Sequence, residues 1–452
     1  MKCIDLFAGP GGLGEGFARG GFSIAISIEK ETTECRTLLN RKVYNLLLSQ
    51  GQISRAASLS QADLGEAELT ELYPEETMVA KQQVAQLELG VVPFKEVHQS
   101  IQSSLEGGDN DPLVLLGGPP CQAYSIVGRS RNIGKSKVTD NPELLKEFYA
   151  DARHTLYREY LKVLSVFEPD IFIMENVKGI LSARTGPEAE KGSVINNIIA
   201  DLKNPGCALE EDQEFQREIS ELSIQLAKSN YVLVPLVEKI KGDLLQELSD
   251  RLEPSDFLIR CEEHGVPQTR HRLIICGIRE DVFEAKGNPK QLSRAKSPTT
   301  VEQVIKTFPK LRSNITRQEI AEDAWSGAVK DEIEKLASIN QPNVQDAAPT
   351  EARPTKAKVQ GNKHLSDFLE DSSKRISGHK TRSHMISDLA RYHFCADFAE
   401  REGRSPKIND WPVGKLAPDH KDIRNEGNRL STSGFSDRFK VQVWNKPCLL
   451  YT

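Results

Sequence analysis

Short apolar runs alternate with helix-forming segments along the first 280 residues of this 452-residue chain, and this alternation limits the possible folds most strongly. The runs that we interpret as buried strands are Ile4–Phe7, Phe22–Ile28, Leu113–Leu116, Ile171–Met174 and Arg272–Ile278. Residues 151–167 carry apolar side chains at helical spacing and predict an amphipathic helix. Strands that alternate with helices predict an α/β fold with a doubly wound, mostly parallel sheet.

Two long segments and the C-terminal part interrupt this alternation. Residues 40–110 and 183–250 are rich in helix-forming residues, and we interpret them as helical insertions within one domain, 1–280. Residues 281–452 form a second, smaller region. Within it, residues 340–363 are poor in aromatic side chains and rich in Pro, Ala and polar residues, which predicts a flexible surface loop.

The charge of the chain is unevenly distributed. The formal net charge of -6 does not by itself suggest binding to nucleic acid. Residues 281–452 contain 29 Lys and Arg against 23 Asp and Glu, whereas residues 1–280 contain 30 against 42. A basic second part indicates a surface that faces a polyanion, although ordinary variation of surface charge gives the same pattern.

The cysteine usage and the N-terminus indicate a cytoplasmic protein. No run approaches the roughly 20 apolar residues that span a bilayer, and Asp5 comes too early for a signal peptide. The eight cysteines are scattered without a CxxC motif or paired His and Cys spacing. This pattern argues against a metal site and a disulfide framework, and fits a reducing cytosol.

A glycine-rich loop follows the first predicted strand. Gly9, Gly11 and Gly14 form a G-x-G-x-x-G pattern, and Glu29 follows 20 residues after the first glycine, at the end of the next strand. Glycines allow a ligand close to the backbone, and an acid at that spacing can bind ribose hydroxyls. The pattern favours an adenosine-containing cofactor, with NAD or a purely structural turn as alternatives.

Cys121 stands just beyond the end of a predicted strand. It follows the apolar run Leu113–Leu116 and the sequence Gly-Gly-Pro-Pro, and Gln122 and Ala123 come next. In open α/β sheets, ligands bind at the carboxyl ends of the strands. A partly exposed thiol there is a candidate nucleophile, while the alternative is a small buried side chain.

Three charged residues lie close to other predicted strands. Glu175 follows an entirely apolar strand, where it acts either as a helix N-cap or as a functional acid. Arg270 and Arg272 project to the same side of an extended chain. They form either a clamp for a phosphate or carbonyl group, or a solvated basic turn.

Four segments together resemble the cytosine-C5 DNA methyltransferases of restriction-modification systems. They are DLFAGPGGLGEGF, GGPPCQAYS, MENVKGI and EEHGVPQTRHRLIICGI, in the order of the family. Tyr124 stands where many members have phenylalanine, so an aromatic ring is retained. The resemblance implies a Rossmann-like methyltransferase domain at 1–280 that uses S-adenosyl-L-methionine, and a target-recognition region at 281–452.

The resemblance also implies a role for each matching residue. Cys121 would add to C6 of a cytosine flipped out of duplex DNA, and Glu175 would hold its ring N3 and exocyclic amine. Arg272, with Arg270, would contact the cytosine carbonyl or a nearby phosphate. The residues implied to bind S-adenosyl-L-methionine are Phe7, Gly9, Gly11, Gly12 and Glu29, with Phe7 against the adenine and Glu29 on the ribose.

Contacts with DNA are expected from both parts of the chain. The resemblance implies Ser125 and Gln268 in the matching motifs, and Arg438 in a segment similar to one restriction-modification branch. The implied partners are double-stranded DNA and a cognate restriction endonuclease, and the protein is expected to be a monomer. A catalytically silent DNA-binding remnant and an RNA cytosine-C5 methyltransferase are the alternatives.

The family pattern continues beyond the segment Phe439–Pro447. Members carry a further arginine-containing motif and a closing Gly-Asn motif, and neither occurs before Thr452. We therefore expect a C-terminal truncation, with weak cofactor binding and an inactive chain, or a need for a complementing C-terminal fragment.

Overall fold

The computed structural model describes most of the first 305 residues and shorter stretches beyond them. The described residues are 1–60, 62, 64–105, 111–120, 156–185, 189–226, 229–237, 252–305, 311, 313–316, 325–335, 381, 383–404, 406, 410, 442–444 and 446–449. The chain divides into two compact units, with the described residues of Met1–Lys306 in the first and those from Thr307 onward in the second. The predictions for Cys121, Ser125, Arg438 and residues 340–363 lie outside the described residues.

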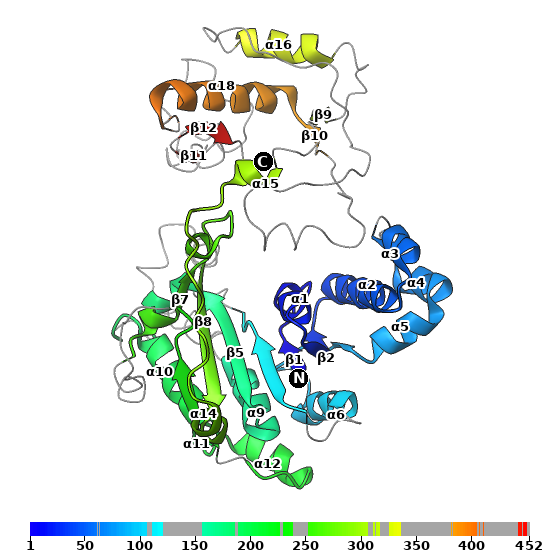
Figure 1. Cartoon of the computed structure of the whole chain (residues 1–452), viewed down its shortest axis with the longest axis vertical. Helices are drawn as coiled ribbons and strands as arrows, with labels where there is room; N and C mark the ends of the chain where they lie inside the picture. The colour runs from blue at the N-terminus through cyan, green and yellow to red at the C-terminus, as the bar shows by residue number, and fades with distance from the viewer. Residues whose placement is uncertain are drawn as a thin grey trace, which may run out of the picture. The chain divides into compact units, whose positions relative to one another are not determined.

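An eight-stranded sheet forms the centre of the first unit (Figure 1), in the order β3-β2-β1-β4-β5-β8-β6, with β7 paired to β8 off this path. The strands are β1 Lys2–Leu6, β2 Ser23–Glu29, β3 Val84–Gln86, β4 Leu113–Gly117, β5 Ile171–Val177, β6 Tyr231–Val234, β7 Leu258–Arg260 and β8 His271–Arg279. Strands β1 to β5 run parallel to one another, whereas β8 is antiparallel to its three neighbours. The predicted α/β fold with a mostly parallel sheet is confirmed.

The direction of β8 is not visible in the sequence pattern, which by itself suggests another parallel strand. A parallel connection needs a crossover of about a dozen residues or more, usually a helix. Residues 261–270 between β7 and β8 are too few, and they contain only the short 3-10 helix η5 (Cys261–His264). Strand β8 therefore returns as an antiparallel partner of β7, with Arg260 opposite His271.

The two predicted helical insertions each contribute a strand to the sheet as well as helices. Residues 40–110 include β3, and residues 183–250 include β6. The helices of the first insertion bury their own apolar cluster, which contains Leu39, Val43, Tyr44, Leu47, Ala56, Leu59, Leu69, Tyr73 and Ala80. The helices concerned are α2 Thr32–Ser49, α3 Ile53–Leu59, α4 Glu66–Leu72 and α5 Pro74–Lys81.

Helices cover both faces of the sheet, because alternate residues of each strand point to opposite sides. Helices α6, α9, α10 and α12 pack on the face of Ile4, Leu115 and Phe172. Helices α1 and α14 pack on the face of Cys3 and Ile173. These helices are α1 Gly12–Arg19, α6 Phe94–Leu105, α9 Tyr157–Phe167, α10 Ser193–Lys203, α12 Gln213–Glu221 and α14 Glu280–Lys286. The described part of the predicted helix 151–167 is α9.

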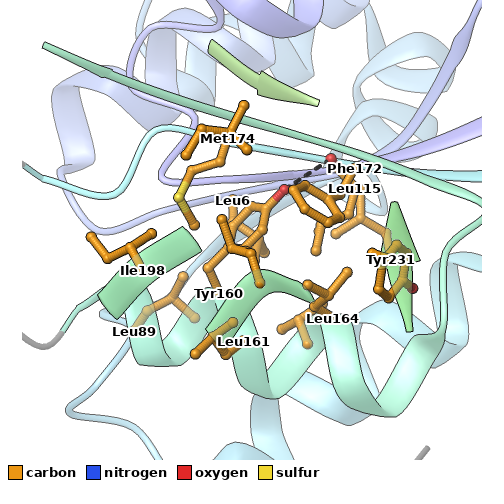
Figure 2. Packing of buried hydrophobic residues seen from close by; sticks show 14 of the residues in the cluster. Leu6, Leu89, Leu115, Tyr160, Leu161, Leu164, Phe172, Met174, Ile198 and Tyr231 are labelled. Atoms are coloured by element: carbon orange, nitrogen blue, oxygen red, sulfur yellow. Dashed lines mark hydrogen bonds between the residues drawn. The ribbon is translucent and has the colours of Figure 1, made fainter. Parts of the chain in front are cut away.

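Tyr160 shows how closely α9 approaches β4 (Figure 2). Its side chain is fully buried, and its hydroxyl group donates a 3.1 Å hydrogen bond to the carbonyl oxygen of Leu115. A Cβ atom on Gly117 would lie 2.7 Å from the Tyr160 ring, closer than any side chain allows. Glycine is therefore required at Gly117, and the end of β4 that leads to Pro119 is packed directly against the helix.

The second unit has a small apolar core of its own. Helix α16 (Trp325–Lys335) and helix α18 (Ile386–Glu402) contribute Trp325, Val329 and Ala390 to it. Its short strands are β9 Asn314–Ile315 paired with β10 Ser383–His384, and β11 Gln442–Trp444 paired with β12 Lys446–Leu449. Among the helices that the structure describes, none is both long and apolar enough to cross a membrane.

Candidate active site

Four neighbouring strands, β2, β1, β4 and β5, are paired in register near their carboxyl ends. The ladders pair Leu6 with both Ile28 and Gly117, and pair Gly117 with Met174. The residues that follow these four positions form a row across the sheet, namely Glu29, Phe7, Gly118 and Glu175. Neighbouring strands lie about 4.8 Å apart, so the backbones at the two ends of this row are roughly 14 Å apart. The order of the strands reverses between β1 and β4, which is where ligands bind in doubly wound sheets.

The glycine loop after β1 has an unusual backbone. Phe7, Gly9 and Gly11 have φ angles of 53°, 55° and 92°, all in the left-handed region. A bulky residue such as Phe7 rarely adopts this conformation, and such strain is concentrated at functional sites. The loop is nevertheless fixed, because the N–H of Ala8 donates a 3.1 Å hydrogen bond to Ile28 and that of Gly11 a 3.0 Å bond to Ala8.

Glu29 holds this loop from the end of β2. Its Oε2 accepts a 2.8 Å hydrogen bond from the N–H of Gly9, and its Oε1 accepts bonds from the N–H groups of Lys30 and Glu31. A Cβ atom placed on Gly9 or on Gly12 would meet no atom of the described chain within 4 Å. The loop therefore presents its backbone to open space beside a carboxylate, which is an arrangement that can receive an adenosine group.

Asp5, which sequence reasoning missed, lies buried in β1 next to this loop. Its side chain is 1% exposed, and Oδ2 has no hydrogen-bond partner among the described residues. A Cβ atom on Gly14 would lie 2.6 Å from that oxygen. Burial raises the pKa of Asp5 to about 7 despite the opposing charge of Lys42. The available signal was a charged residue within an otherwise apolar strand.

Glu175 and Arg272 meet at the other end of the row. In the antiparallel ladder Arg272 lies opposite Val177, so its side chain is on the same face as that of Glu175. Nε of Arg272 lies 2.6 Å from Oε1 of Glu175, and both side chains are about three-quarters buried. The two groups form an ion pair, although the orientation of Nε does not satisfy hydrogen-bond geometry. Two opposite charges this close attract strongly at any orientation.

The environment of Glu175 also excludes the helix N-cap interpretation. The predicted strand Ile171–Met174 is three residues too short, since pairing with β8 extends β5 to Val177, and Glu175 lies within the strand. The N-cap of the following 3-10 helix, η2 (Lys178–Ser182), is Val177. Oε2 of Glu175 instead lies 3.3 Å from the Cβ position of Gly118, at the start of the segment that leads to Cys121.

Asn176 connects β5 to the Pro-Pro segment. Its side chain is buried, and Nδ2 donates a 3.3 Å hydrogen bond to the carbonyl oxygen of Pro119. Its Oδ1 accepts a 2.9 Å bond from the N–H of Val177. The last described residues before Cys121 are therefore fixed to the same strand that carries Glu175.

Arg270 and Gln268 lie on a tight loop before β8. The N–H of Gln268 donates to Val266 and that of Arg270 donates to Gln268, each over 2.8 Å, which makes two successive three-residue turns. The carbonyl oxygen of Arg270 accepts a 3.2 Å bond from the N–H of Cys261. Both Gln268 and Arg270 are exposed, unlike Arg272, whose side chain is mostly buried.

The predicted site residues thus fall into two groups at one edge of the sheet. The cofactor group consists of Phe7, Gly9, Gly11, Gly12 and Glu29, and the base group contains Glu175 with Arg272. Gln268 and Arg270 lie on the exposed loop next to the base group. Among the described residues, no cluster of His, Cys, Asp and Glu is arranged to hold a metal ion.

Curated relatives of this chain are type II methyltransferases. It is 28% identical over 331 residues to M.Bpa9945I of Bacillus paralicheniformis, covering 69% of this chain and 61% of that protein. It is 31% identical over 208 residues to M.AgeI of Thalassovita gelatinovora, covering 46% and 34%. It is 24% identical over 207 residues to M.AquIA of Picosynechococcus sp., covering 45% and 57%. The chain therefore matches less than two thirds of the length of each of these relatives.

The C-5 cytosine-specific DNA methylase family matches residues 85–209 and 251–429. These segments include β5 and β8, which carry the base group of the site. Because the match covers more than half of the sequence, the chain belongs to the C-5 cytosine-specific DNA methylase family.

Proposed function

We propose that this protein transfers a methyl group from S-adenosyl-L-methionine to C5 of cytosine in duplex DNA. The observation that carries the proposal is the row at the sheet edge, which aligns Glu29 and Phe7 with Gly118 and Glu175. Family membership supports the reaction class. The row explains how one edge can hold a methyl donor and a base at neighbouring strand ends.

The cofactor group fits the adenosine part of S-adenosyl-L-methionine. The open space at Gly9 and Gly12 admits a ligand to the backbone, and Oε2 of Glu29, which accepts one of the three backbone bonds, has a lone pair left for a ribose hydroxyl. The ring of Phe7, only half-buried, is available to contact the adenine. When bound, the cofactor supplies an activated methyl group on a sulfonium.

The base group provides the charges that cytosine chemistry requires. In our proposal, the thiolate of Cys121 forms a bond to C6 and the ring electrons shift so that C5 can accept the methyl group. The exocyclic amine donates a hydrogen bond to Glu175, and N3 donates a second one after it takes up a proton from solvent as the thiolate adds, a proton that it returns when the S–C6 bond breaks. Arg272 keeps the carboxylate of Glu175 oriented through the 2.6 Å ion pair. Loss of the C5 proton to a base and cleavage of the S–C6 bond then restore the ring and the thiolate.

Duplex DNA is the proposed substrate, with the target base flipped out of the helix. Gln268 and Arg270 are exposed on a tight loop beside the base group, where they can reach the DNA backbone next to the flipped base. Since the relatives are type II methyltransferases, we propose that methylation protects DNA from a cognate restriction endonuclease. DNA methylated by the protein should then resist one member of a panel of such nucleases.

A transfer assay tests the proposal directly. The chain is incubated with methyl-labelled S-adenosyl-L-methionine and unmethylated mixed-sequence duplex, and 5-methylcytosine is quantified in the product. Cys121→Ser should abolish transfer, whereas Cys207→Ser should not, because Cys207 is an exposed cysteine on the separate helix α11 (Pro205–Ala208). A duplex containing 5-fluorocytosine should trap a covalent adduct with the wild type and with Cys207→Ser but not with Cys121→Ser, since fluorine cannot leave C5 as a proton does.

The same assay separates the alternative functions. Transfer to tRNA in preference to duplex DNA would indicate an RNA methyltransferase. Binding to duplex without transfer or adduct would indicate a catalytically silent DNA-binding protein, and would contradict the proposed function.

A further inference from the structure

A half-buried carboxylate and imidazole pair lies on the side of β8 away from Glu175. Oε1 of Glu262 lies 2.7 Å from Nε2 of His271, and the two side chains are 29% and 27% exposed. The other carboxylate oxygen, Oε2 of Glu262, is buried without a hydrogen-bond partner among the described residues. His271 is therefore the side chain to which this carboxylate is bound.

The position of His271 gives the pair its significance. His271 stands between Arg270 and Arg272, and consecutive residues of a strand point to opposite faces. Leu273 and Ile275, which share the side of His271, belong to the core face of α9, whereas Arg272 shares the face of Glu175. If the side chain of His271 is held on one face of β8, Arg272 is therefore directed to the other face, toward Glu175.

The position of Glu262 allows it to hold the side chain of His271 in place. It lies in η5, directly after β7, and the backbone bond from Cys261 to Arg270 brings the two ends of the connection together. Although burial opposes ionisation, the backbone N–H of Glu262 and the side chain of His271 lower the pKa of its carboxyl group. The carboxylate is thus ionised at neutral pH and accepts the hydrogen bond from His271.

We propose that Glu262 is a positioning residue that acts through His271 to hold the loop of Gln268 and Arg270, and the start of β8 with Arg272, in the geometry that binds DNA. This inference rests on the proposed function, because it specifies how that site is supported. Glu262 does not touch the substrate in this arrangement. Its effect is to reduce the motion of the arginines, which matters because small displacements of binding groups weaken a site strongly.

The neighbouring acid provides a matched control. Glu263 is bound to Arg260 and Arg294, each over 3.4 Å, and it makes no contact with His271 among the described interactions. Glu262 and Glu263 have the same chemistry and similar exposure in the same 3-10 helix. They differ in that, within the described part of the chain, Glu262 and not Glu263 binds a side chain of the strand that carries Arg272.

The main experiment measures binding of the full chain to a fluorescent mixed-sequence duplex by anisotropy, and to S-adenosyl-L-methionine by calorimetry. Glu262→Ala should raise the Kd for the duplex about tenfold and leave the Kd for the cofactor within about twofold, since the cofactor group lies on other strands. Glu262→Gln should recover most of the affinity, because its amide oxygen can still accept the bond. Glu263→Ala should match the wild type. A merely structural role would reduce the fraction of folded protein without changing either Kd.

Hydrogen exchange of residues 266–272 supplies an activity-independent measurement. Faster exchange there in Glu262→Ala than in Glu263→Ala supports the proposal, and equal exchange overturns it, as does an equal Kd for the duplex. A wild-type chain that binds duplex but transfers no methyl group contradicts the proposed function and not this inference. If the wild-type chain binds no duplex, the exchange comparison alone decides.

Discussion

The cofactor group and the base group occupy the same sheet edge but are held by different parts of the chain. In the cofactor group the backbone carries the geometry, through the left-handed conformations of Phe7 and Gly9 and the bond from Gly9 to Glu29. In the base group, side-chain contacts determine the geometry, namely the Glu175–Arg272 ion pair and the hydrogen bond from Asn176 to Pro119. The first group should therefore be sensitive to changes of backbone freedom, and the second to changes of charge.

The largest effect is expected in the base group. Glu175→Gln keeps the shape of the side chain but removes the negative charge next to Arg272, and should lower the rate of methyl transfer about 10³-fold. The affinity for S-adenosyl-L-methionine should stay within about twofold, because the cofactor group is held separately. Single-turnover transfer and calorimetry provide the two measurements.

Glu71→Gln is the control for this prediction, because Glu71 is an exposed acid on α4. It should change neither the rate nor the affinity. Equal losses of rate and cofactor affinity in Glu175→Gln would show that the two groups are not independent, and would break the comparison.

The buried carboxyl group of Asp5, next to the glycine loop of the cofactor group, predicts that the free energy of unfolding depends on pH. Its pKa is raised to about 7 by burial, so between about pH 4 and 7 the folded state keeps a proton that the unfolded state has lost. The free energy of unfolding should therefore fall as the pH rises through this window, by at most roughly 4 kcal/mol in total. Urea unfolding of wild type and Asp5→Asn across the window measures the difference.

Asp5→Asn should remove this contribution, whereas Asp111→Asn, at an exposed position before β4, should retain it. The comparison between variants is needed because other groups have the opposite sign. Burial lowers the pKa of His98, for example, so its contribution to stability rises with pH. Identical pH profiles for wild type and Asp5→Asn would contradict the prediction.

Two glycines of α1 test how tightly this side is packed. Gly14→Ala places a methyl group 2.6 Å from Oδ2 of Asp5 and should lower the free energy of unfolding by about 1–3 kcal/mol. The methyl group of Gly16→Ala meets no atom of the described residues within 4 Å, and this change should instead raise the free energy of unfolding by up to about 1 kcal/mol, because alanine favours the helix. Chemical denaturation of the two variants measures effects of opposite sign, and a shared sign would contradict the packing.

A smaller loss of stability than that of Gly14→Ala is expected at Gly9. Gly9→Ala strains a backbone with φ of 55° by about 1–2 kcal/mol, and Gly403→Ala, with φ of 65° at the end of α18, should cost the same. Only the first places a methyl group in the proposed cofactor space. Calorimetric titration should show weaker binding of S-adenosyl-L-methionine in Gly9→Ala alone, and equal affinities would refute that location.

Much of the fold could be predicted from local patterns. Strands β1, β2, β4 and β5 are short apolar runs with buried neighbours on both faces, so their composition alone identifies them. Glu29 and the glycine loop were identified as a pair from their spacing, and the 2.8 Å bond between Gly9 and Glu29 confirms that they are adjacent. The roles of these residues in binding remain predictions.

The remainder depends on partners that are distant in the sequence. Strand β3 has only three residues and lies among helix-forming segments, so its periodicity is too short to detect. The extension of β5 to Val177 depends on pairing with β8, more than ninety positions later. The importance of Glu262 becomes visible only when its partner His271 is known.

The register of the strands also determines where the chain can change its length. Because side chains alternate along β5, deletion of one residue would turn Glu175 from the face of Ile173 to the face that packs on Tyr160. A crossover segment has no such constraint, since added residues leave the flanking strands in place. The long stretches 40–110 and 183–250 both lie largely in crossovers, so variants of different length there are expected to keep the same row of residues at the sheet edge.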